Sequence, residues 1–523
     1  MTKYIVITGG IISGLGKGIT SSSIGLLYKS MGINVSCIKI DPYLNIDAGT
    51  MSPHEHGECY VLKDGYESDL DLGNYERFLD IELTRNNNIT TGQIYNQVIN
   101  NERKGLYLGK TVQIIPHITD EIKRRITNQE SKPDLCIIEV GGTVGDIEIS
   151  PFIEALRQLA YNDNIDMYFI HVGLVLEHDE LKTKPLQNSV STCRKLGINN
   201  DMLIIRSKNK LQQNIIDKIN THCQVKNIIN NYSVNNIYYV PQILMEQNII
   251  NIINSKLMLN IKEQNLNSYL NVINYFDNID KYPELELAII SKYSGPDSYL
   301  SLVRAIEAAA FYLHLKINIS WLDAIDNDFS DDKLGEHKIL NKYDGFIIPG
   351  GFGNRGIKGK LQVVKYARIM QKPILGICLG MQIMVVDIYN ITNNGTSSEW
   401  EFEGDKVIDM QPNNNDIYGG NMRLGNYKVD FIDNTKIKNI YQSDYTYERH
   451  RHRYNVNNKY LQILKNNGLV ISGICDDLIE TIEYANDQYY IGCQYHPEYR
   501  SSFSNPNPLF TSLLKKMYEN INV

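Results

Sequence analysis

Short runs of apolar, mostly β-branched residues alternate with helix-compatible stretches along the first half of the chain. Six of these runs are typical of strands, at 4–8, 34–40, 135–140, 167–172, 202–207 and 237–241. Several are apolar at nearly every position, as expected of parallel strands that helices cover on both faces. The pattern predicts an α/β fold with a doubly wound parallel sheet, in which ligands bind at the carboxyl ends of the strands.

A polar stretch around 265–283 interrupts this pattern, and a second α/β series follows it. That series has strand-like runs and helix-compatible stretches at 285–291, 298–314, 345–351, 358–370 and 373–380. A chain of 523 residues is also too long for one ordinary hydrophobic core. We therefore predict an N-terminal domain over 1–270, a linker over 271–283 and a C-terminal domain over 284–523.

The composition narrows the class of protein. The net charge of −8 argues against general nucleic-acid binding, which needs a basic surface. The eight cysteines form no C-x-x-C pair, so neither a zinc site nor a disulfide framework is indicated, and a reducing compartment is expected. No signal-peptide pattern and no apolar run long enough to cross a bilayer is present, so we expect a cytoplasmic protein without membrane contact.

One cysteine in the second half has the surroundings of a nucleophile. Cys378 lies in "GICLGMQ", between an apolar strand and a helix, with small neighbours that permit a sharp turn. The helix start favours a thiolate there. His496 closes a strand-like run, and Glu498, two residues on, would share its face and orient it. The loop "PGGFG" at 349–353 and the N–H of Leu379 could bind an oxyanion. A lone buried cysteine is more often core packing, but the three motifs together favour catalysis.

These motifs resemble class I glutamine amidotransferase domains. The resemblance implies that Cys378, His496 and Glu498 hydrolyse glutamine through a thioester and release ammonia. It also implies a set of glutamine-binding residues, with Glu401 as the alternative to Glu399: Gly351, Leu379, Gly380, Met381, Gln382, Glu399 and Arg453.

The glycine-rich stretch "GGIISGLGKGIT" (9–20) follows the first predicted strand. Its backbone N–H groups and Lys17 could bind phosphates, although Gly18 stands where a standard P-loop has Ser or Thr. Asp71 and Glu139 are candidate Mg²⁺ ligands. Glu139 ends an apolar strand, where an unused carboxylate would be costly. Lys39 and Asp41 lie at another strand end, and Lys182 and Lys184 suit a second polyphosphate, although a solvated loop is the simpler interpretation of each lysine alone.

Motifs along the whole chain resemble the CTP synthase family. They include "KIDPYLNIDAGTMSP", "DLDLGNYERF", "EVGGTVGDIE", "KTKP" and "ERHRHRY", and with the glutaminase motifs they cover the chain from near residue 1 to about 510. The resemblance implies ATP-dependent phosphorylation of the uracil 4-oxygen of UTP and its displacement by ammonia to give CTP. It further implies Mg²⁺, GTP as an activator, CTP as a feedback inhibitor, and a homotetramer that can form filaments.

The same resemblance assigns nucleotide-binding residues. The residues implied for ATP are Gly14, Leu15, Gly16, Lys17, Gly18, Ile19, Asp71, Arg206 and Val234, and Val234 belongs to a segment, Tyr232–Val234, that lies near ATP in the family. Mg²⁺ would be held by Asp71 and Glu139. Those implied for UTP or CTP are Ser13, Lys39, Asp146, Ile147, Glu148, Lys182, Thr183, Lys184, Pro185, Leu186, Gln187 and Lys218. Leu186 departs from the family, which commonly has Thr there.

Two other functions compete with this interpretation. One is a different glutamine-dependent amide ligase, such as those of cobalamin synthesis, which "KTKP" and "DLDLGNYERF" disfavour. The other is a nucleotide-binding scaffold without catalysis, which should have lost Lys17, Cys378 or His496. The basic run 449–453 could be a nucleic-acid patch, but the acidic chain does not favour that.

Overall fold

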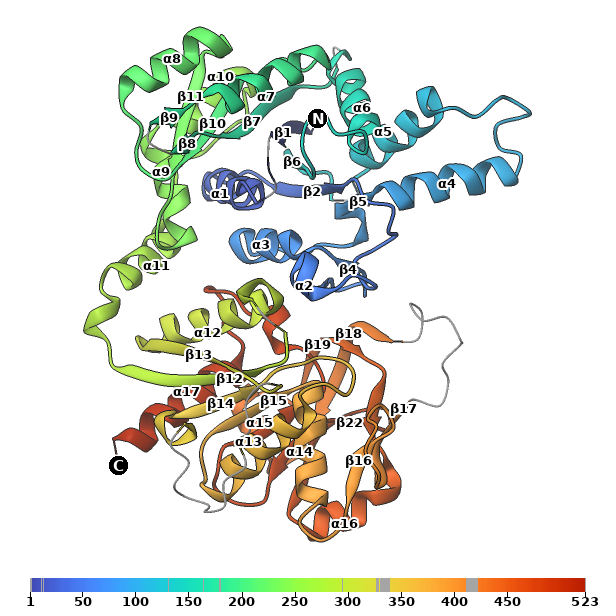
Figure 1. Ribbon diagram of the computed structural model, residues 1–523, viewed down its shortest axis with the longest axis vertical. Coiled ribbons are helices and arrows are strands. Elements are labelled where there is room, and N and C mark those ends of the chain that lie inside the picture. Colours follow the sequence, from blue (N-terminus) through green and yellow to red (C-terminus); the bar gives the residue numbers. More distant parts are fainter. Residues whose placement is uncertain are drawn as a thin grey trace. The chain divides into compact units, whose positions relative to one another are not determined.

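Two compact units make up the computed structural model (Figure 1). The structure describes residues 2–10, 12, 14–129, 131–162, 164–177, 180–293, 295–325, 329, 339–410 and 422–522. Unit 1 comprises residues 1–48 and 71–273, and unit 2 comprises residues 49–70 and 274–523. We call residues 49–70 the strap. It belongs to the C-terminal unit although it lies early in the sequence.

Unit 1 is built on a seven-stranded sheet in which every pairing is parallel. In spatial order its strands are β11 (Asn227–Tyr232), β10 (Met202–Ser207), β7 (Met167–Leu174), β1 (Lys3–Gly9), β6 (Leu135–Val140), β2 (Val35–Asp41) and β5 (Asn88–Thr90). The central strands are buried along almost their whole length, which explains their continuous apolar sequence. The predicted α/β fold with a parallel sheet is confirmed.

Helices cover this sheet. The helices that lie wholly or partly in unit 1 are α1 (Lys17–Ser30), α3 (Leu70–Leu79), α4 (Thr91–Arg103), α5 (Thr119–Thr127), α6 (Ser150–Ala160), α7 (Lys184–Lys195), α8 (Gln213–Cys223), α9 (Val240–Glu246), α10 (Ile249–Leu257) and α11 (Asn267–Asp277). One core cluster joins Val6, Ile38 and Ile138 of the sheet to Ile122 of α5 and Phe152 of α6. Because all strands of this sheet are parallel, the loops that follow them emerge at the same edge, where polar residues of different loops can lie close together.

One predicted strand is wrong. Residues 237–241 form a 3-10 turn (Ile237–Tyr239) and the start of α9, where Pro241 occupies the first turn. Proline suits that position because its missing N–H would have no partner there. The outer strand is instead β11, with the sequence "NIINNY", whose asparagines conceal the apolar pattern. The polar segment predicted as a linker (271–283) includes the end of α11 and a 3-10 turn, Ile279–Lys281.

Unit 2 has a nine-stranded mixed sheet. In order its strands are β13 (Lys316–Asp323), β12 (Glu284–Ser291), β14 (Gly345–Ile348), β15 (Ile374–Ile377), β23 (Tyr490–Cys493), β22 (Leu478–Tyr484), β21 (Leu469–Cys475), β18 (Arg423–Phe431) and β19 (Tyr445–His452). The first five are parallel and the rest pair antiparallel. A small sheet holds β16 (Gly395–Ser397), β17 (Asp405–Met410) and β20 (Tyr454–Val456).

Two core clusters cover the two faces of this sheet. Leu287 and Ile289 of β12 belong to one, with α12 (Leu300–Leu313) and α17 (Pro508–Ile521). Ala288 and Ile290 belong to the other, with α13 (Ile357–Ile369) and α14 (Leu379–Tyr389). This alternation is the two-residue period of a strand. The remaining helices and the strap's elements are α15 (Lys436–Tyr441), α16 (Leu461–Asn466), α2 (Pro53–His56), β3 (Tyr60–Val61) and β4 (Glu67–Ser68).

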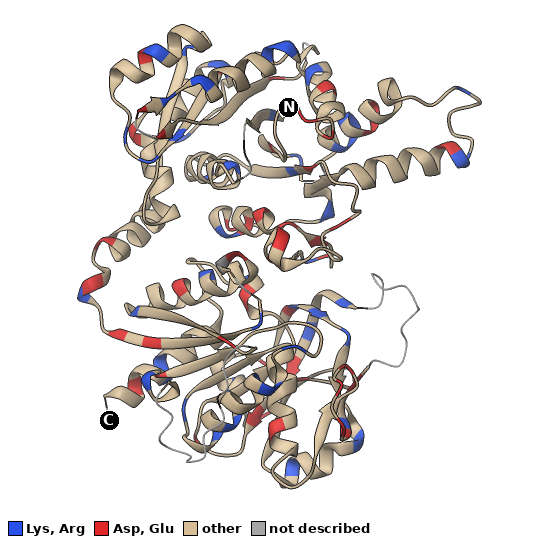
Figure 2. Cartoon of the chain, in the orientation of Figure 1, with Lys and Arg blue, Asp and Glu red and all other residues tan. Residues whose placement is uncertain are grey.

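Charged residues of both signs are interspersed over both units (Figure 2), in keeping with the modest net charge of −8. Among the described residues, no helix is both long enough and apolar enough to cross a membrane.

Candidate active sites

Cys378 lies in a sharp turn between β15 and α14. Its backbone has φ 54° and ψ −105°, a conformation that L-residues seldom adopt, and it caps the N-terminus of α14. Such strain concentrates at functional sites and is characteristic of a nucleophile elbow. Cys378 therefore stands at the N-terminal end of α14, the positive end of the helix dipole.

His496 and Glu498 form a hydrogen-bonded pair in unit 2. Nδ1 of His496 lies 2.7 Å from Oε1 of Glu498, and both side chains are buried. Burial lowers the pKa of His496, but the Glu498 carboxylate and the Cys378 thiol outweigh it and raise the pKa to about 10. The pair was predicted on extended backbone, but His496 instead caps the 3-10 turn Pro497–Arg500, which contains Glu498.

Gly350 lies where the cysteine and the histidine approach each other. A Cβ on this glycine would be 2.9 Å from Cε1 of His496 and 3.6 Å from Cβ of Cys378. Nε2 of His496 has no hydrogen-bond partner among the described residues, so it is available to a thiol or a substrate atom. Catalytic hydrogen bonds often form only in the substrate complex. The geometry supports proton transfer by His496 beside a Cys378 nucleophile.

Two buried lysines, which no local sequence motif marks, fix the glycine loop 349–353. Nζ of Lys292 donates to the carbonyls of Phe352 (2.5 Å) and Gly353 (2.9 Å), and Nζ of Lys360 donates to that of Pro349 (3.0 Å). Burial lowers the pKa of Lys292 to about 8 and that of Lys360 well below its usual value. Because the lysine Nζ atoms donate hydrogen bonds to carbonyl oxygens of the loop, backbone N–H groups of the loop can face a ligand.

A cavity of about 250 Å³ opens at these residues within unit 2. Its lining combines the candidate catalytic residues, the glycine loop and part of the strap, and includes Cys378, His496, Gly351, Arg453, Gly49 and Cys59. A small cavity with a few convergent polar groups is typical of a small-molecule site.

The predicted glutamine-binding residues divide into two groups. Leu379 and Met381 are core residues, and a Cβ on Gly380 would lie 2.0 Å from the carbonyl oxygen of Ile348. These residues could contact a ligand only through their backbone. Nε2 of the buried Gln382 donates to the carbonyl of Tyr454 at 3.1 Å, so this side chain supports the site from behind.

Arg453 lines the cavity, whereas Glu399 lies beside the glycine loop and not in the lining of the cavity. Oε1 of Glu399 accepts the N–H of Gly353 at 2.8 Å, and burial raises the pKa of this carboxyl. The Arg453 guanidinium lies 5.7 Å from the ring centre of Phe352. Glu401, the alternative to Glu399, is exposed.

The glycine-rich loop of unit 1 joins β1 to α1. Gly14 and Gly16 have φ 72° and 80°, a left-handed conformation that glycine adopts without strain. Lys17 begins α1, is buried, and donates to the carbonyl of Gly142 at 2.9 Å. Burial lowers the pKa of Lys17. Leu15, Gly18 and Ile19 complete the turn and first helical residues, while Ser13 lies outside the described residues.

Four charged groups of unit 1 lie together at the carboxyl ends of β2 and β6. Lys39 pairs with Asp71 and lies 3.8 Å from Glu139 and 3.5 Å from Asp41. A Cβ on Gly18 would be 2.2 Å from Oδ1 of Asp71 and 3.4 Å from Oε2 of Glu139. Burial and the Asp71 charge raise the pKa of Glu139 to about 7. Two crowded carboxylates beside a phosphate-type loop fit the few ligands that Mg²⁺ takes from a protein.

Arg206 and Val234 lie at the carboxyl ends of the adjacent strands β10 and β11. Nη1 of Arg206 donates to the carbonyl of Asn231 at 2.7 Å, and a Cβ on Gly16 would be 3.9 Å from Nε of Arg206. Val234 is half-buried and lies two residues after Tyr232, the last residue of β11, which pairs with Ser207 of β10. Arg206 is thus brought to the glycine-rich loop.

Apart from Lys39 at the end of β2 and Ser13, the predicted UTP residues lie in three places on unit 1. Asp146, Ile147 and Glu148 form an exposed loop after β6. Lys182–Gln187 lead from the short hairpin β8 (Leu176–Glu177) and β9 (Leu181–Lys182) into α7, and within them Leu186 is fully buried against Gly173. Any ligand contact of Leu186 would therefore use its backbone. Lys218 is exposed on α8 and acts electrostatically on Glu180 beside the hairpin.

Two protein families match this chain. The family "CTP synthase N-terminus" matches residues 3–259, and "glutamine amidotransferase class-I" matches residues 296–516. Among solved structures, the Trypanosoma brucei CTPS glutaminase domain with bound acivicin is 29% identical and has a TM-score of 0.42. The match covers 45% of this chain and 94% of that one.

Curated relatives match over almost their whole length. A CTP synthase of Caldanaerobacter subterraneus is 45% identical over 537 residues, covering 99% of this chain and 98% of the relative. A CTP synthase of Sulfolobus acidocaldarius is 45% identical over 530 residues, covering 98% of this chain and 99% of the relative. Identity at this level over both halves shows common descent, and this chain belongs to the CTP synthase family.

Proposed function

We propose that this chain is a glutamine-hydrolysing CTP synthase, a ligase that forms a C–N bond. It phosphorylates the 4-oxygen of UTP with ATP, and ammonia from glutamine then displaces that phosphate to give CTP. The observation that carries the proposal is that one chain combines two complementary sites. One holds a cysteine, histidine and glutamate around a small cavity, and the other holds a phosphate-type loop beside clustered acids and lysines.

In the C-terminal unit, Cys378 attacks the glutamine amide carbon. His496, held by Glu498, moves the proton to the departing ammonia and then activates the water that hydrolyses the thioester. The N–H groups of Gly351 and Leu379 stabilise the oxyanion. Glu399 binds the glutamine ammonium, and Arg453 binds the glutamine carboxylate.

In the N-terminal unit, backbone N–H groups of Gly14–Ile19 hold the ATP phosphates, and Lys17 neutralises their charge. Asp71 and Glu139 would hold Mg²⁺, which when bound offsets negative charge on the phosphates. Arg206 and Val234 flank the ATP. Lys39 counters the charge that develops between the two substrates.

UTP, and CTP as feedback inhibitor, bind through three groups of residues. They are Lys39, the exposed loop Asp146–Glu148, and Lys182–Gln187 with Lys218. Ser13 belongs to the same set by resemblance. GTP activation, a homotetramer, filament formation and a cytoplasmic location are further parts of the proposal that rest on the family resemblance alone.

Two substitutions test the division of labour. Cys378→Ala should abolish glutamine-dependent CTP formation and leave ammonia-dependent formation intact. Lys17→Ala should abolish CTP formation from either nitrogen source while glutamate release from glutamine persists. Loss of both activities in Cys378→Ala, or ammonia-dependent synthesis by Lys17→Ala, would refute the assignment.

A further inference from the structure

The strap (residues 49–70) is docked on the C-terminal unit through its backbone. The turn of its β3–β4 hairpin contains Gly65, which has φ 82° and meets Gly425 of β18. A Cβ on Gly425 would lie 2.5 Å from the Gly65 nitrogen, so the two backbone segments touch without intervening side chains. The N–H of Asn426 donates to the carbonyl of Lys63 at 3.1 Å. These contacts fix the position of the strap against β18.

The strap also forms hydrogen bonds with Tyr499, whose aromatic ring lies against His496. The Tyr499 ring stacks on the His496 imidazole, with centroids 5.1 Å apart and planes at 18°. The Tyr499 hydroxyl donates to the carbonyl of Cys59 at 3.0 Å, and the Tyr60 hydroxyl donates to the carbonyl of Tyr499 at 2.9 Å. The strap therefore anchors Tyr499 at both its side chain and its backbone.

A second path runs from the strap to His496 through β19. The carbonyl of Arg449 accepts the backbone N–H of His496 at 2.8 Å. The fully buried guanidinium of Arg449 donates to the Tyr60 hydroxyl (3.1 Å) and to the carbonyl of Val61 (3.0 Å). The Tyr60 hydroxyl thus contacts both Tyr499, which stacks on His496, and Arg449, which accepts the His496 N–H.

A third path leads to the nucleophile. Sγ of Cys378 lies 3.7 Å from the carbonyl oxygen of Arg451. Nε of Arg451 donates to the buried carboxylate of Glu67 at 2.8 Å, and Nη2 donates to the carbonyl of Gly49 at 3.3 Å. A Cβ on Gly49 would be 2.2 Å from Oε2 of Glu67, so the strap packs closely around this ion pair.

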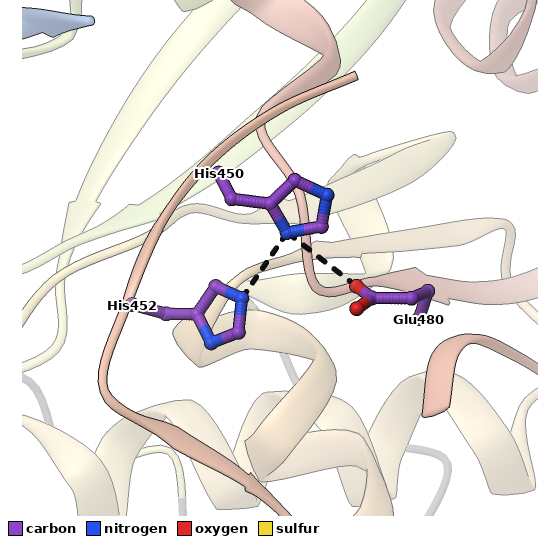
Figure 3. Close-up of side chains that lie close together, drawn as sticks. All are labelled: His450, His452 and Glu480. Atoms are coloured by element: carbon purple, nitrogen blue, oxygen red, sulfur yellow. Dashed lines mark hydrogen bonds and ion pairs between the residues drawn. The ribbon is translucent and has the colours of Figure 1, made fainter. Parts of the chain in front are cut away.

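The opposite face of β19 is held from inside unit 2 (Figure 3). Nδ1 of His450 lies 3.1 Å from Nε2 of His452 and 3.5 Å from the Glu480 carboxylate, and all three side chains are buried. These residue types could bind a metal ion, but Arg423 already gives Glu480 a cationic partner at 3.1 Å. Because side chains alternate along a strand, β19 is fixed on one face by this cluster and on the other by the strap.

We propose that the strap is a working part of the glutaminase site, with Tyr60 and Glu67 as positioning residues for His496 and Cys378. The inference rests on the proposed glutaminase activity. It assigns a role in the C-terminal reaction to residues that lie within the matched "CTP synthase N-terminus" region, 3–259. The strap touches the catalytic groups through Tyr499, Arg449 and Arg451, and so it sets their geometry without contacting the reacting atoms.

Tyr60→Phe in the full-length protein tests this. The substitution keeps the ring and removes the hydroxyl, so we expect kcat for glutamate release to fall roughly 10- to 100-fold, as small misplacements of catalytic groups do. KM for glutamine should change less than about threefold, because the glutamine-contacting residues are untouched. Ammonia-dependent CTP formation should stay within about twofold of wild type.

Matched variants separate positioning from stability. Tyr489→Phe removes a buried hydroxyl bonded to the Leu509 carbonyl (2.8 Å) and to Ser512 (2.9 Å), away from the strap, and should leave kcat unchanged. Tyr499→Phe should lower kcat as Tyr60→Phe does. The double variant should fall less than the product of the two, since both hydroxyls act in one network.

Three results would overturn the proposal. They are a wild-type kcat in Tyr60→Phe, an equal fall in Tyr489→Phe, or a parallel loss of ammonia-dependent synthesis in Tyr60→Phe. Failure of the proposed function itself looks different, because the wild-type chain would then form no CTP from either nitrogen source.

Discussion

Replacement of Glu498 by glutamine should move the pH dependence of glutamine hydrolysis. The pKa of His496 stands at about 10 against an ordinary 6.5, a difference of 3.5. At 1.36 kcal/mol for each pKa unit, this is on the order of 5 kcal/mol in favour of the imidazolium. Burial opposes that preference, and the Glu498 carboxylate is the largest contribution that sustains it. Glutamine keeps the shape of the side chain but has no charge, so we expect the pKa to fall by about 1–3.

The sign of the effect follows from the role of the imidazolium. The protonated ring donates to the departing ammonia, so activity falls as pH rises through the pKa of His496. The stability that the charged ring adds to the fold is likewise fully present below pH 6.5 and lost as pH rises through about 10. In Glu498→Gln the basic limb of kcat/KM should therefore move to lower pH, and kcat should fall roughly 10²-fold.

The assay is glutamate release measured from pH 6 to 10.5, beside ammonia-dependent CTP formation at each pH as the control for an intact protein. Ammonia-dependent formation should keep its wild-type profile, because the substitution lies in the other unit. A lower kcat with an unmoved basic limb would contradict the electrostatic role and leave Glu498 a purely geometric one.

Three further substitutions probe other parts of the chain. Gly18→Ala places a Cβ 2.2 Å from Oδ1 of Asp71, so CTP formation from both nitrogen sources should fall while glutamate release persists; unchanged synthesis would contradict the convergence of Asp71 and Glu139 there. Lys360→Met leaves the carbonyl of Pro349 unbonded, so urea denaturation should show a loss of about 1–3 kcal/mol and glutamate release should drop; an unaltered kcat would separate this lysine from the glycine loop. Gly380→Ala forces a Cβ within 2.0 Å of the Ile348 carbonyl, and calorimetry should show a destabilisation of about 1–3 kcal/mol, whereas a wild-type Tm would mean that α14 shifts freely.

The apolar strands were predictable from sequence because parallel strands buried on both faces need apolar residues throughout. Residues 202–207 and 135–140 were predicted with the bounds that the structure shows. At the sheet edge the same reasoning failed. The outer strand β11 contains three asparagines among its six residues, while the apolar run after it begins a helix at a proline.

The candidate catalytic residues were recognisable because each lies in a local motif whose glycines or proline set the backbone. Their supporting residues were not. Lys292, just after β12, and Lys360 of α13 reach the glycine loop, and a lone lysine in a sequence is usually a solvated surface residue. Only the folded chain shows that these two are buried and bonded to loop carbonyls.

The sequence by itself determined the two α/β units, the nucleophile turn at Cys378 and the phosphate-type loop at Lys17, because each depends on residues adjacent along the chain. The tertiary structure alone decided which distant residues meet. It brought Asp71 and Glu139 to Gly18, and it docked residues 49–70 onto β18 and β19 beside Cys378 and His496. Such contacts arise from packing between segments hundreds of residues apart, as between Tyr60 and Arg449, and no local spacing encodes them.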